Sequence, residues 1–170
     1  DVRRKMIAGN WKMPKTVGES IALAEDIVME TNGTLNEVVI FPTFTALESV
    51  ADAIDGKHVG YGAQDLHWED AGAYTGAISG AMIADLCAEY VMVGHSERRA
   101  LFGDNEAVVA KKMVAAYRNG LKPMLCVGEN LEEREAGKTA RKISMQLSNA
   151  LRVITAEQAE NMVVAYEPVW

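Results

Sequence analysis

The sequence predicts an α/β fold in which a parallel sheet is connected by helical crossovers. Short apolar runs alternate with stretches of helical periodicity along all 170 residues, a pattern typical of repeated βα units. The apolar runs lack a clear period of two, as expected for strands buried on both faces. Residues 93–97 and 127–132 echo each other, because both place a glycine, a polar residue and an acidic helical turn after a strand. Such repeats favour a (β/α)8 barrel, although a doubly wound sheet also fits them.

The expected elements follow one another without a linker or a low-complexity segment, so residues 1–170 are expected to form a single domain. Strands are predicted at residues 5–11, 38–41, 59–63, 91–93, 122–127 and 163–166. Helices are predicted at residues 17–31, 45–54, 80–88, 105–119 and 131–151, the last broken near Gly137. The polar stretch that starts at Gln64 and ends at Ser79 is expected to be a long loop.

Composition excludes several classes of function. The net charge of −7 argues against a nucleic acid or an acidic membrane as partner. The apolar runs are too short for a membrane-spanning helix. The three histidines are too scattered for a metal motif, so no metal site is expected. Two cysteines, Cys87 and Cys126, do not suggest a disulfide scaffold and fit a reducing cytoplasm.

One histidine stands where a predicted strand meets a predicted helix. The apolar run at residues 91–93 stops at Gly94, and His95 follows it. Ser96 is expected to cap the next helix, and Glu97 falls in its first turn, where the helix dipole favours a carboxylate. A helix N-terminus favours the neutral imidazole, which can donate a hydrogen bond to a carbonyl group. The alternative is a capping histidine that is satisfied by backbone.

Two further polar sets fall at strand ends, where parallel α/β folds place their active sites. Asn10 and Lys12 follow the first strand, and their i, i+2 spacing in an extended segment would put an amide and an ammonium on one side. Alone, they also fit a turn asparagine beside a surface lysine. Glu167 follows the last strand between Tyr166 and Pro168, where partial desolvation would make it a stronger base. Its alternative is an acid at a helix start.

Taken together, these residues provide a carboxylate base, a neutral electrophile and a fixed cation. Proton transfer next to a carbonyl requires such a set, because the base removes the proton while the imidazole and the ammonium stabilise the enediolate. Glu129 is the rival carboxylate, and it is interpreted as structural because the acidic run after Asn130 suggests a solvated helix start.

Four segments, spread in order over the chain, resemble the triosephosphate isomerase family. They are residues 8–13 (AGNWKM), 93–99 (VGHSERR), 126–129 (CVGE) and 165–170 (AYEPVW). The resemblance implies a parallel (β/α)8 TIM barrel. It also implies interconversion of dihydroxyacetone phosphate and glyceraldehyde 3-phosphate through an enediolate, a reaction of glycolysis and gluconeogenesis, in the cytoplasm and without a cofactor.

The resemblance also implies roles for individual residues. Glu167 would be the catalytic base and His95 the electrophile, while Lys12 would bind phosphate and enediolate and Asn10 would support the carbonyl oxygen. Ser96 and Glu97 would stand behind the catalytic groups, with Glu97 pairing with Lys12. The loop at residues 64–79 would reach into a second copy of the chain and form a homodimer.

The chain departs from the family in length, since eight βα units need about 250 residues. The expectation is therefore the larger, N-terminal part of a barrel, truncated to about six strands, without the family's lid and most of its phosphate cradle. Such a chain is expected to be nearly inactive alone and to need a C-terminal fragment. The alternative function is a non-catalytic α/β fragment that only binds a partner or a small anion.

Overall fold

A computed structural model describes residues 4–170, which divide into two compact units. The first unit contains the described chain up to Gln64 together with Ala81–Tyr90, and the second contains Asp65–Gly80 and Val91–Trp170. The single-domain organisation remains a prediction. Within residues 4–170, every helix is too short or too polar to cross a membrane.

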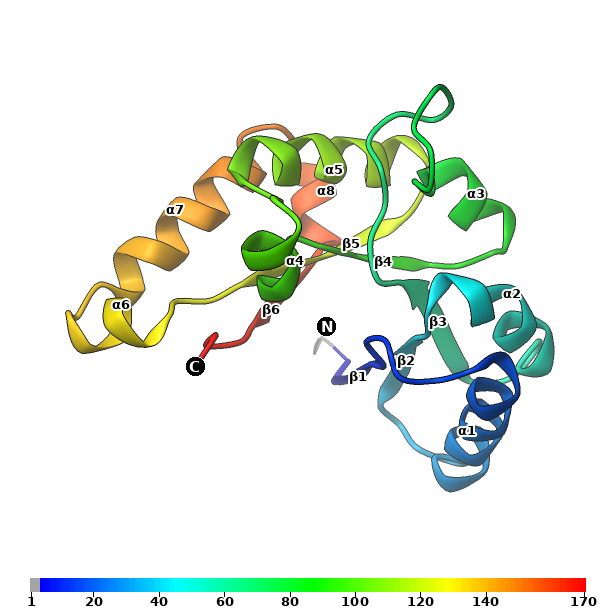
Figure 1. Ribbon diagram of the computed structural model, residues 1–170. Coiled ribbons are helices and arrows are strands. Elements are labelled where there is room, and N and C mark those ends of the chain that lie inside the picture. Colours follow the sequence, from blue (N-terminus) through cyan, green and yellow to red (C-terminus); the bar gives the residue numbers. More distant parts are fainter. Residues whose placement is uncertain (1–3) are drawn as a thin grey trace. The chain divides into compact units, whose positions relative to one another are not determined.

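The first unit is built on three parallel strands, β1 (Met6–Asn10), β2 (Glu37–Phe41) and β3 (Val59–Ala63), which follow one another in that order. Parallel pairing aligns β1 with β2 from end to end, and β2 with β3 over three residues. Helices α1 (Val17–Glu30) and α2 (Phe44–Ala53) pack against each other beside these strands (Figure 1). The core between them contains Ala24, Val38, Ile40, Val50 and Ile54.

The second unit carries the remaining strands, which are β4 (Tyr90–Val93), β5 (Lys122–Val127) and β6 (Val163–Tyr166). The first residue of β4, Tyr90, is assigned to the first unit. Strands β5 and β6 pair in parallel. The helices of this part of the chain are α4 (Ser96–Leu101), α5 (Glu106–Arg118), α6 (Leu131–Glu135), α7 (Thr139–Leu151) and α8 (Ala156–Glu160). Helices α5 and α7 pack on each other and on β5 (Figure 1).

Most predicted boundaries lie within one residue of the observed ones, but one helix ends early and one helix was not predicted. Strands β3, β5 and β6 have the predicted limits, and the helix break falls at Gly137, whose φ of 66° suits glycine. Helix α3 (Gly80–Asp85) is shorter than predicted because Cys87 has a φ of 57°, which helical residues do not adopt. Helix α8 was not predicted, although the Thr155–Gln158 capping box was a usable sequence pattern for it.

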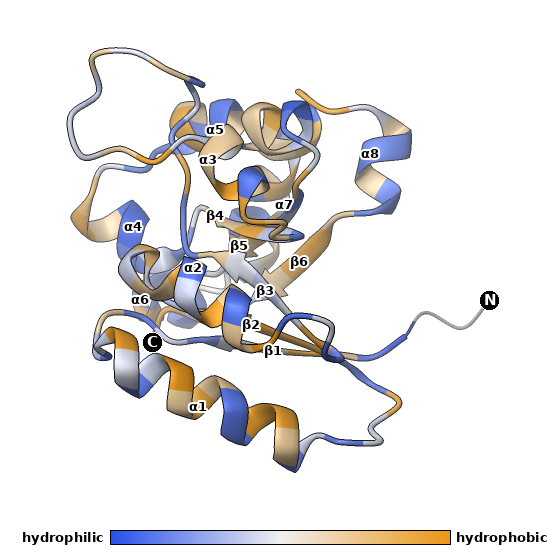
Figure 2. Ribbon diagram, turned by 90° about the vertical axis from the view of Figure 1, so that its right-hand side faces the viewer, coloured by the Kyte–Doolittle hydropathy of each residue, from blue (hydrophilic) through white to orange (hydrophobic). Residues whose placement is uncertain are grey.

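Burial on both faces holds for the inner strands but not for β1 and β6. All of β4 is buried, as are four of the five residues of β2 and five of the six residues of β5. In contrast, Ile7 of β1 and Val164 and Tyr166 of β6 are exposed, and Figure 2 shows the hydrophobic colouring along β6. These two strands therefore present apolar side chains that another element of the fold could cover.

Candidate active site

The imidazole of His95 is positioned by the turn that follows β4. Gly94 reverses the chain with a φ of 71°, and His95 itself, not Ser96 as predicted, is the N-cap of α4. Its Nδ1 accepts a hydrogen bond of 3.2 Å from the backbone N–H of Glu97. Ser96 could not take this place because it already has helical geometry as the first residue of α4. The ring of His95 therefore caps α4, as the alternative interpretation of the sequence had it. Nε2, on the other side of the ring, points away from the helix.

The capping bond decides which ring nitrogen carries the proton. A neutral imidazole has one N–H, and a nitrogen that accepts a hydrogen bond is not protonated. Because Nδ1 of His95 accepts, the neutral ring is assigned as the tautomer with the proton on Nε2. The side chain is buried to 9% exposure, so this N–H has a fixed direction and serves as a preorganised donor.

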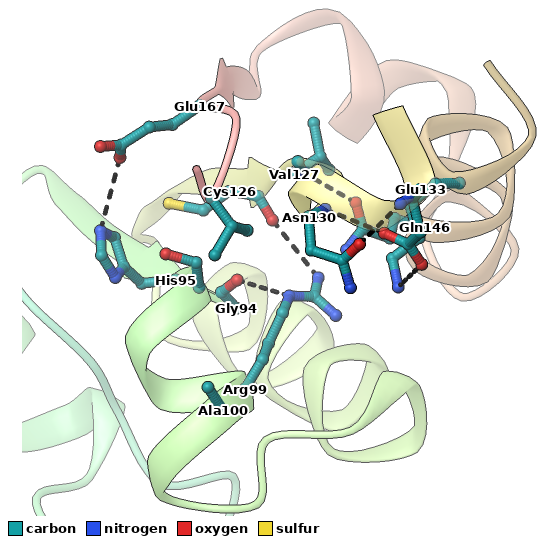
Figure 3. Close-up of a pocket in the computed structure, with 14 residues that line it drawn as sticks. Gly94, His95, Arg99, Ala100, Cys126, Val127, Asn130, Glu133, Gln146 and Glu167 are labelled. Atoms are coloured by element: carbon teal, nitrogen blue, oxygen red, sulfur yellow. Dashed lines mark hydrogen bonds and ion pairs between the residues drawn. The ribbon is translucent and has the colours of Figure 1, made fainter. Parts of the chain in front are cut away.

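The carboxylate of Glu167 lies opposite that donor. Its Oε2 is 3.7 Å from Nε2 of His95, and the two side chains point toward one another in Figure 3. This separation is too long for a direct hydrogen bond, so both groups remain able to bind a third molecule. The carboxylate is 66% exposed. Most of this side chain is therefore in contact with water, and Val169 and Trp170, which follow it in the chain, are themselves exposed. The expected partial desolvation stays a prediction.

Backbone contacts fix the segment that carries Glu167. The N–H of Glu167 donates to the carbonyl of Val127 at 2.9 Å, and the N–H of Val169 donates to the carbonyl of Glu129 at 2.9 Å. Gly128 lies between these two anchors, and a Cβ atom there would collide with the carbonyl group of Glu167. The glycine thus permits a close approach of two backbones that no larger residue would allow.

His95, Ser96 and Glu167 line a cavity of about 370 Å³. Cys126 also lines it, and burial raises the pKa of the Cys126 thiol to about 12, against a smaller lowering by the charge of Arg99. A thiol with this pKa stays protonated at neutral pH and is a poor nucleophile. The cavity therefore offers an imidazole donor and a carboxylate acceptor rather than covalent chemistry.

Glu129 is structural, as interpreted from the sequence, but for a different reason. It is fully buried rather than solvated, and it accepts hydrogen bonds from Tyr166 at 3.0 Å to each oxygen and from Thr139 at 3.2 Å. Burial, the largest effect, raises its pKa, but these bonds, a backbone hydrogen bond and the charge of Arg134 outweigh it and leave the pKa lowered. The acidic run after Asn130 gave no indication of this burial.

We expect Tyr166→Phe to lower the free energy of unfolding at pH 7 by removing a donor from the buried carboxylate. A pKa held below its ordinary value of 4.5 stabilises the fold above that pH, and this stabilisation is lost as pH falls through the lowered pKa. Urea unfolding should therefore show a difference between variant and parent that shrinks below about pH 4.

A matched control for this prediction is Tyr117→Phe, because the hydroxyl of Tyr117 donates at 2.7 Å to the neutral carbonyl of Gln158. Its effect should be the same at pH 7 and at pH 4. A Tyr166→Phe effect that is equally independent of pH in this range would contradict the assignment of Glu129 as an ionised buried group.

Asn10 and Lys12 belong to the first unit, and residues of that unit contact the backbone of Lys12. Strand β1 ends at Asn10, and Lys12 has a φ of 54°, so the expectation of an extended i, i+2 segment is wrong. Instead, Oδ1 of Asn10 accepts from the N–H of Lys12 at 2.9 Å, and Nε2 of Gln64 donates to the carbonyl of Lys12 at 2.8 Å. Gln64 was not predicted to support Lys12, and its sequence context gave no such indication.

A left-handed lysine carries a cost of about 1–3 kcal/mol, and such backbone strain is concentrated at functional sites. This observation supports the assignment of Lys12 as a site residue. The pairing of Glu97 with Lys12 stays a prediction. Within the second unit, the Glu97 carboxylate lies 3.7 Å from Nδ1 of His95, on the side of the ring opposite Nε2.

Parallel βα units that place a carboxylate opposite an imidazole N–H beyond the strand ends define a class of α/β enzymes suited to general acid–base proton transfer. The triosephosphate isomerase family model matches residues 5–170. Triosephosphate isomerase of Moorella thermoacetica is 49% identical over 169 residues, which cover 99% of this chain and 68% of that protein. Triosephosphate isomerase of Thermoanaerobacter pseudethanolicus is 43% identical over the same shares of each chain.

A solved structure gives the same result. The crystal structure of triosephosphate isomerase from Bartonella henselae matches with a TM-score of 0.90 and 39% identity, and the match covers 99% of this chain and 69% of that one. The chain belongs to the triosephosphate isomerase family, and the predicted fold class is confirmed. Residues 4–170 contain six parallel strands of a TIM barrel and span about 68% of the length of the relatives.

Proposed function

We propose that this chain, completed by the C-terminal part that its relatives have, catalyses the interconversion of dihydroxyacetone phosphate and glyceraldehyde 3-phosphate through an enediolate. Glu167 removes the proton from the carbon next to the carbonyl, and Nε2–H of His95 donates to the oxygen on which negative charge develops. Nε2 of His95, having given its proton to this oxygen, takes the proton of the neighbouring hydroxyl, and Glu167 returns its proton to the neighbouring carbon. Both protons are thus accounted for, and the reaction needs no cofactor. The proposal rests on membership of a family of isomerases together with the site geometry.

One observation carries this mechanism, namely the hydrogen bond from the Glu97 N–H to Nδ1 of His95. It leaves a single N–H on the neutral ring, and this N–H faces the Glu167 carboxylate across 3.7 Å. A carbonyl compound bound in this space would meet a donor at its oxygen and a base at its C–H together. Because Glu167 is 66% exposed here, we propose that bound substrate supplies the exclusion of water that strengthens the base.

Lys12 and Asn10 are proposed as substrate-binding residues, with the ammonium of Lys12 bound to the phosphate and to the enediolate. The support lies in the first unit, where Asn10 and Gln64 hold the left-handed backbone of Lys12 from both sides. Asn10 uses its Oδ1 in this bond, which leaves the amide nitrogen as a donor for a substrate oxygen. Ser96 and Glu97 support the ring of His95.

We also propose a homodimer formed through the loop at residues 64–79. Ion pairs anchor the loop from within the second unit, where Lys112 pairs with Asp65 at 2.7 Å and Arg118 pairs with Asp70 at 3.0 Å. The exposed Tyr74 lies beyond these anchors and is of a residue type enriched at interfaces. An ordered loop with an exposed aromatic residue suits contact with a second copy.

Deleting residues 73–76 is expected to convert the dimer into monomers, because it removes the exposed part of the loop and leaves its anchors. Sedimentation velocity of the parent and the deletion variant measures this directly. A dimer that persists with unchanged stability would show that another surface holds the two copies together.

The remaining third of the relatives' length is proposed to supply further strands and the phosphate cradle, either in the same chain or as a separate C-terminal fragment. Support comes from the exposed apolar residues of β1 and β6, which two further strands of a barrel would cover. The two free cysteines, Cys87 and Cys126, fit the proposed cytoplasmic location.

The test is an isomerase assay with three preparations. They are residues 1–170 alone, the same residues mixed with the C-terminal third of the Moorella thermoacetica enzyme, and a chimera that joins the two. The proposal predicts strong activity for the chimera, partial activity for the mixture and little for residues 1–170 alone. An inactive chimera that is folded by circular dichroism would favour the alternative, a fragment that only binds a partner or a small anion.

A further inference from the structure

Arg99 joins the ends of the two strands that support the site, although the proposed mechanism gives it no role. From α4, its Nε donates to the carbonyl of Gly94 at 2.6 Å and its Nη2 donates to the carbonyl of Cys126 at 3.3 Å, as Figure 3 shows. Its Nη1 pairs with Glu106 at 2.6 Å. The side chain is only 15% exposed, so the guanidinium is part of the interior.

Each of the two carbonyls that Arg99 binds belongs to a residue directly before one that holds a proposed catalytic group. Gly94 directly precedes His95. Cys126 directly precedes Val127, whose carbonyl accepts the N–H of Glu167. The guanidinium therefore connects the backbone that carries the imidazole to the backbone that carries the carboxylate. A planar group with donors at fixed angles is suited to hold two carbonyls at a set distance.

Two observations indicate that this bridge is a built feature. A Cβ atom at Gly94 would lie 2.8 Å from Nη2 of Arg99, so the glycine accommodates the guanidinium as well as the turn. Arg99 and Cys126 also both line the cavity that His95 and Glu167 line, so the bridge is part of the cavity wall.

We propose that Arg99 is a positioning residue that sets the separation of His95 and Glu167 by bridging the carbonyls of Gly94 and Cys126. It lines the same cavity as His95 and Glu167, and its bonds to the backbone and to Glu106 are the contacts through which it acts on the site. Its effect on turnover rests on the proposed function, whereas its effect on the His95 ring does not.

The expected result in the chimera is that Arg99→Ala lowers kcat about 100-fold and changes KM little, because a displacement of about 1 Å between reacting groups costs that much. Arg99→Lys should give an intermediate loss, since an ammonium keeps the charge but cannot span both carbonyls. Arg152→Ala is the matched control because Arg152 is exposed at the end of α7, and its kcat should equal that of the parent.

Added guanidinium separates positioning from stability. If Arg99 acts through its two backbone bonds, guanidinium ions at sub-denaturing concentration should fill the space left in Arg99→Ala and restore kcat with saturation, while methylammonium should not. A variant that was merely less stable would lose activity in guanidinium, a denaturant. The double variant Arg99→Ala/Glu106→Gln does not leave the partly buried Glu106 carboxylate without its cation, and it should respond to guanidinium in the same way.

Nitrogen NMR of the His95 ring in the same chimera gives a readout that does not depend on turnover. The Nε2 resonance should shift in Arg99→Ala and return with guanidinium. If the parent chimera is inactive, the proposed function fails, and this resonance still decides the role of Arg99. An unchanged kcat and an unchanged Nε2 resonance in Arg99→Ala would overturn the positioning role, as would a loss that guanidinium reverses in neither variant.

Discussion

Replacing Glu167 by glutamine is expected to lower kcat of the chimera by about 100- to 10,000-fold, the usual contribution of a general base. Glutamine keeps the size of the side chain and the backbone bond to Val127, but it cannot accept the proton. KM should change little, because the carboxylate acts on a C–H bond and not on the phosphate. Steady-state kinetics in both directions measures the effect.

The matched control is Glu132→Gln, since Glu132 is an exposed carboxylate in the first turn of α6 and has no place in the cavity wall. Its kcat should equal that of the parent. A kcat of Glu167→Gln within a factor of about three of the parent would show that Glu167 is not the base, because a general base contributes far more than that.

Gly128→Ala should have the second largest effect, on both stability and activity. The new Cβ atom would occupy the position of the Glu167 carbonyl, and neither partner can yield as a flexible side chain would, because both are backbone. Overpacking of this kind costs about 1–3 kcal/mol. Displacing the segment that carries the base by about 1 Å should also reduce kcat about 100-fold.

Gly18→Ala is the control for this substitution. Gly18 lies in α1, and a Cβ atom there would have no neighbour within 4 Å among the described residues. Because alanine favours the helix by about 1 kcal/mol over glycine, this variant should be slightly more stable and fully active. Urea unfolding and kinetics of the two variants distinguish a collision at Gly128 from a general effect of replacing glycine.

Local sequence rules were sufficient for most of the elements and for the strand-end position of His95 and Glu167. Apolar runs and capping residues act over a few positions, so the limits of β3, β5 and β6 could be found from them. Parallel α/β folds place their active sites at strand ends, and this rule indicated that His95 and Glu167 would meet. Both line the same cavity in the second unit.

Properties set by packing were not accessible in this way. Glu129 is buried because Tyr166 and Thr139, distant in sequence, supply its donors, and the acidic run beside it suggested the opposite. Glu167 is 66% exposed, although Tyr166 and Pro168 flank it in the sequence. The capping bond of His95 and the backbone bridge by Arg99 depend on side-chain directions, which no local pattern specifies.

The most direct test of the account is the origin of the proton in the product. In D2O, the chimera should convert dihydroxyacetone phosphate into glyceraldehyde 3-phosphate that carries deuterium at carbon 2, because a proton held on the Glu167 carboxylate exchanges with solvent before it returns. The product is trapped by a coupled dehydrogenase and analysed by proton NMR. The predicted result is deuterium at carbon 2, with the labelled product formed far more slowly by Glu167→Gln than by the parent. Product without deuterium, formed as fast by Glu167→Gln as by the parent, would contradict the assignment of Glu167 and His95 as base and donor.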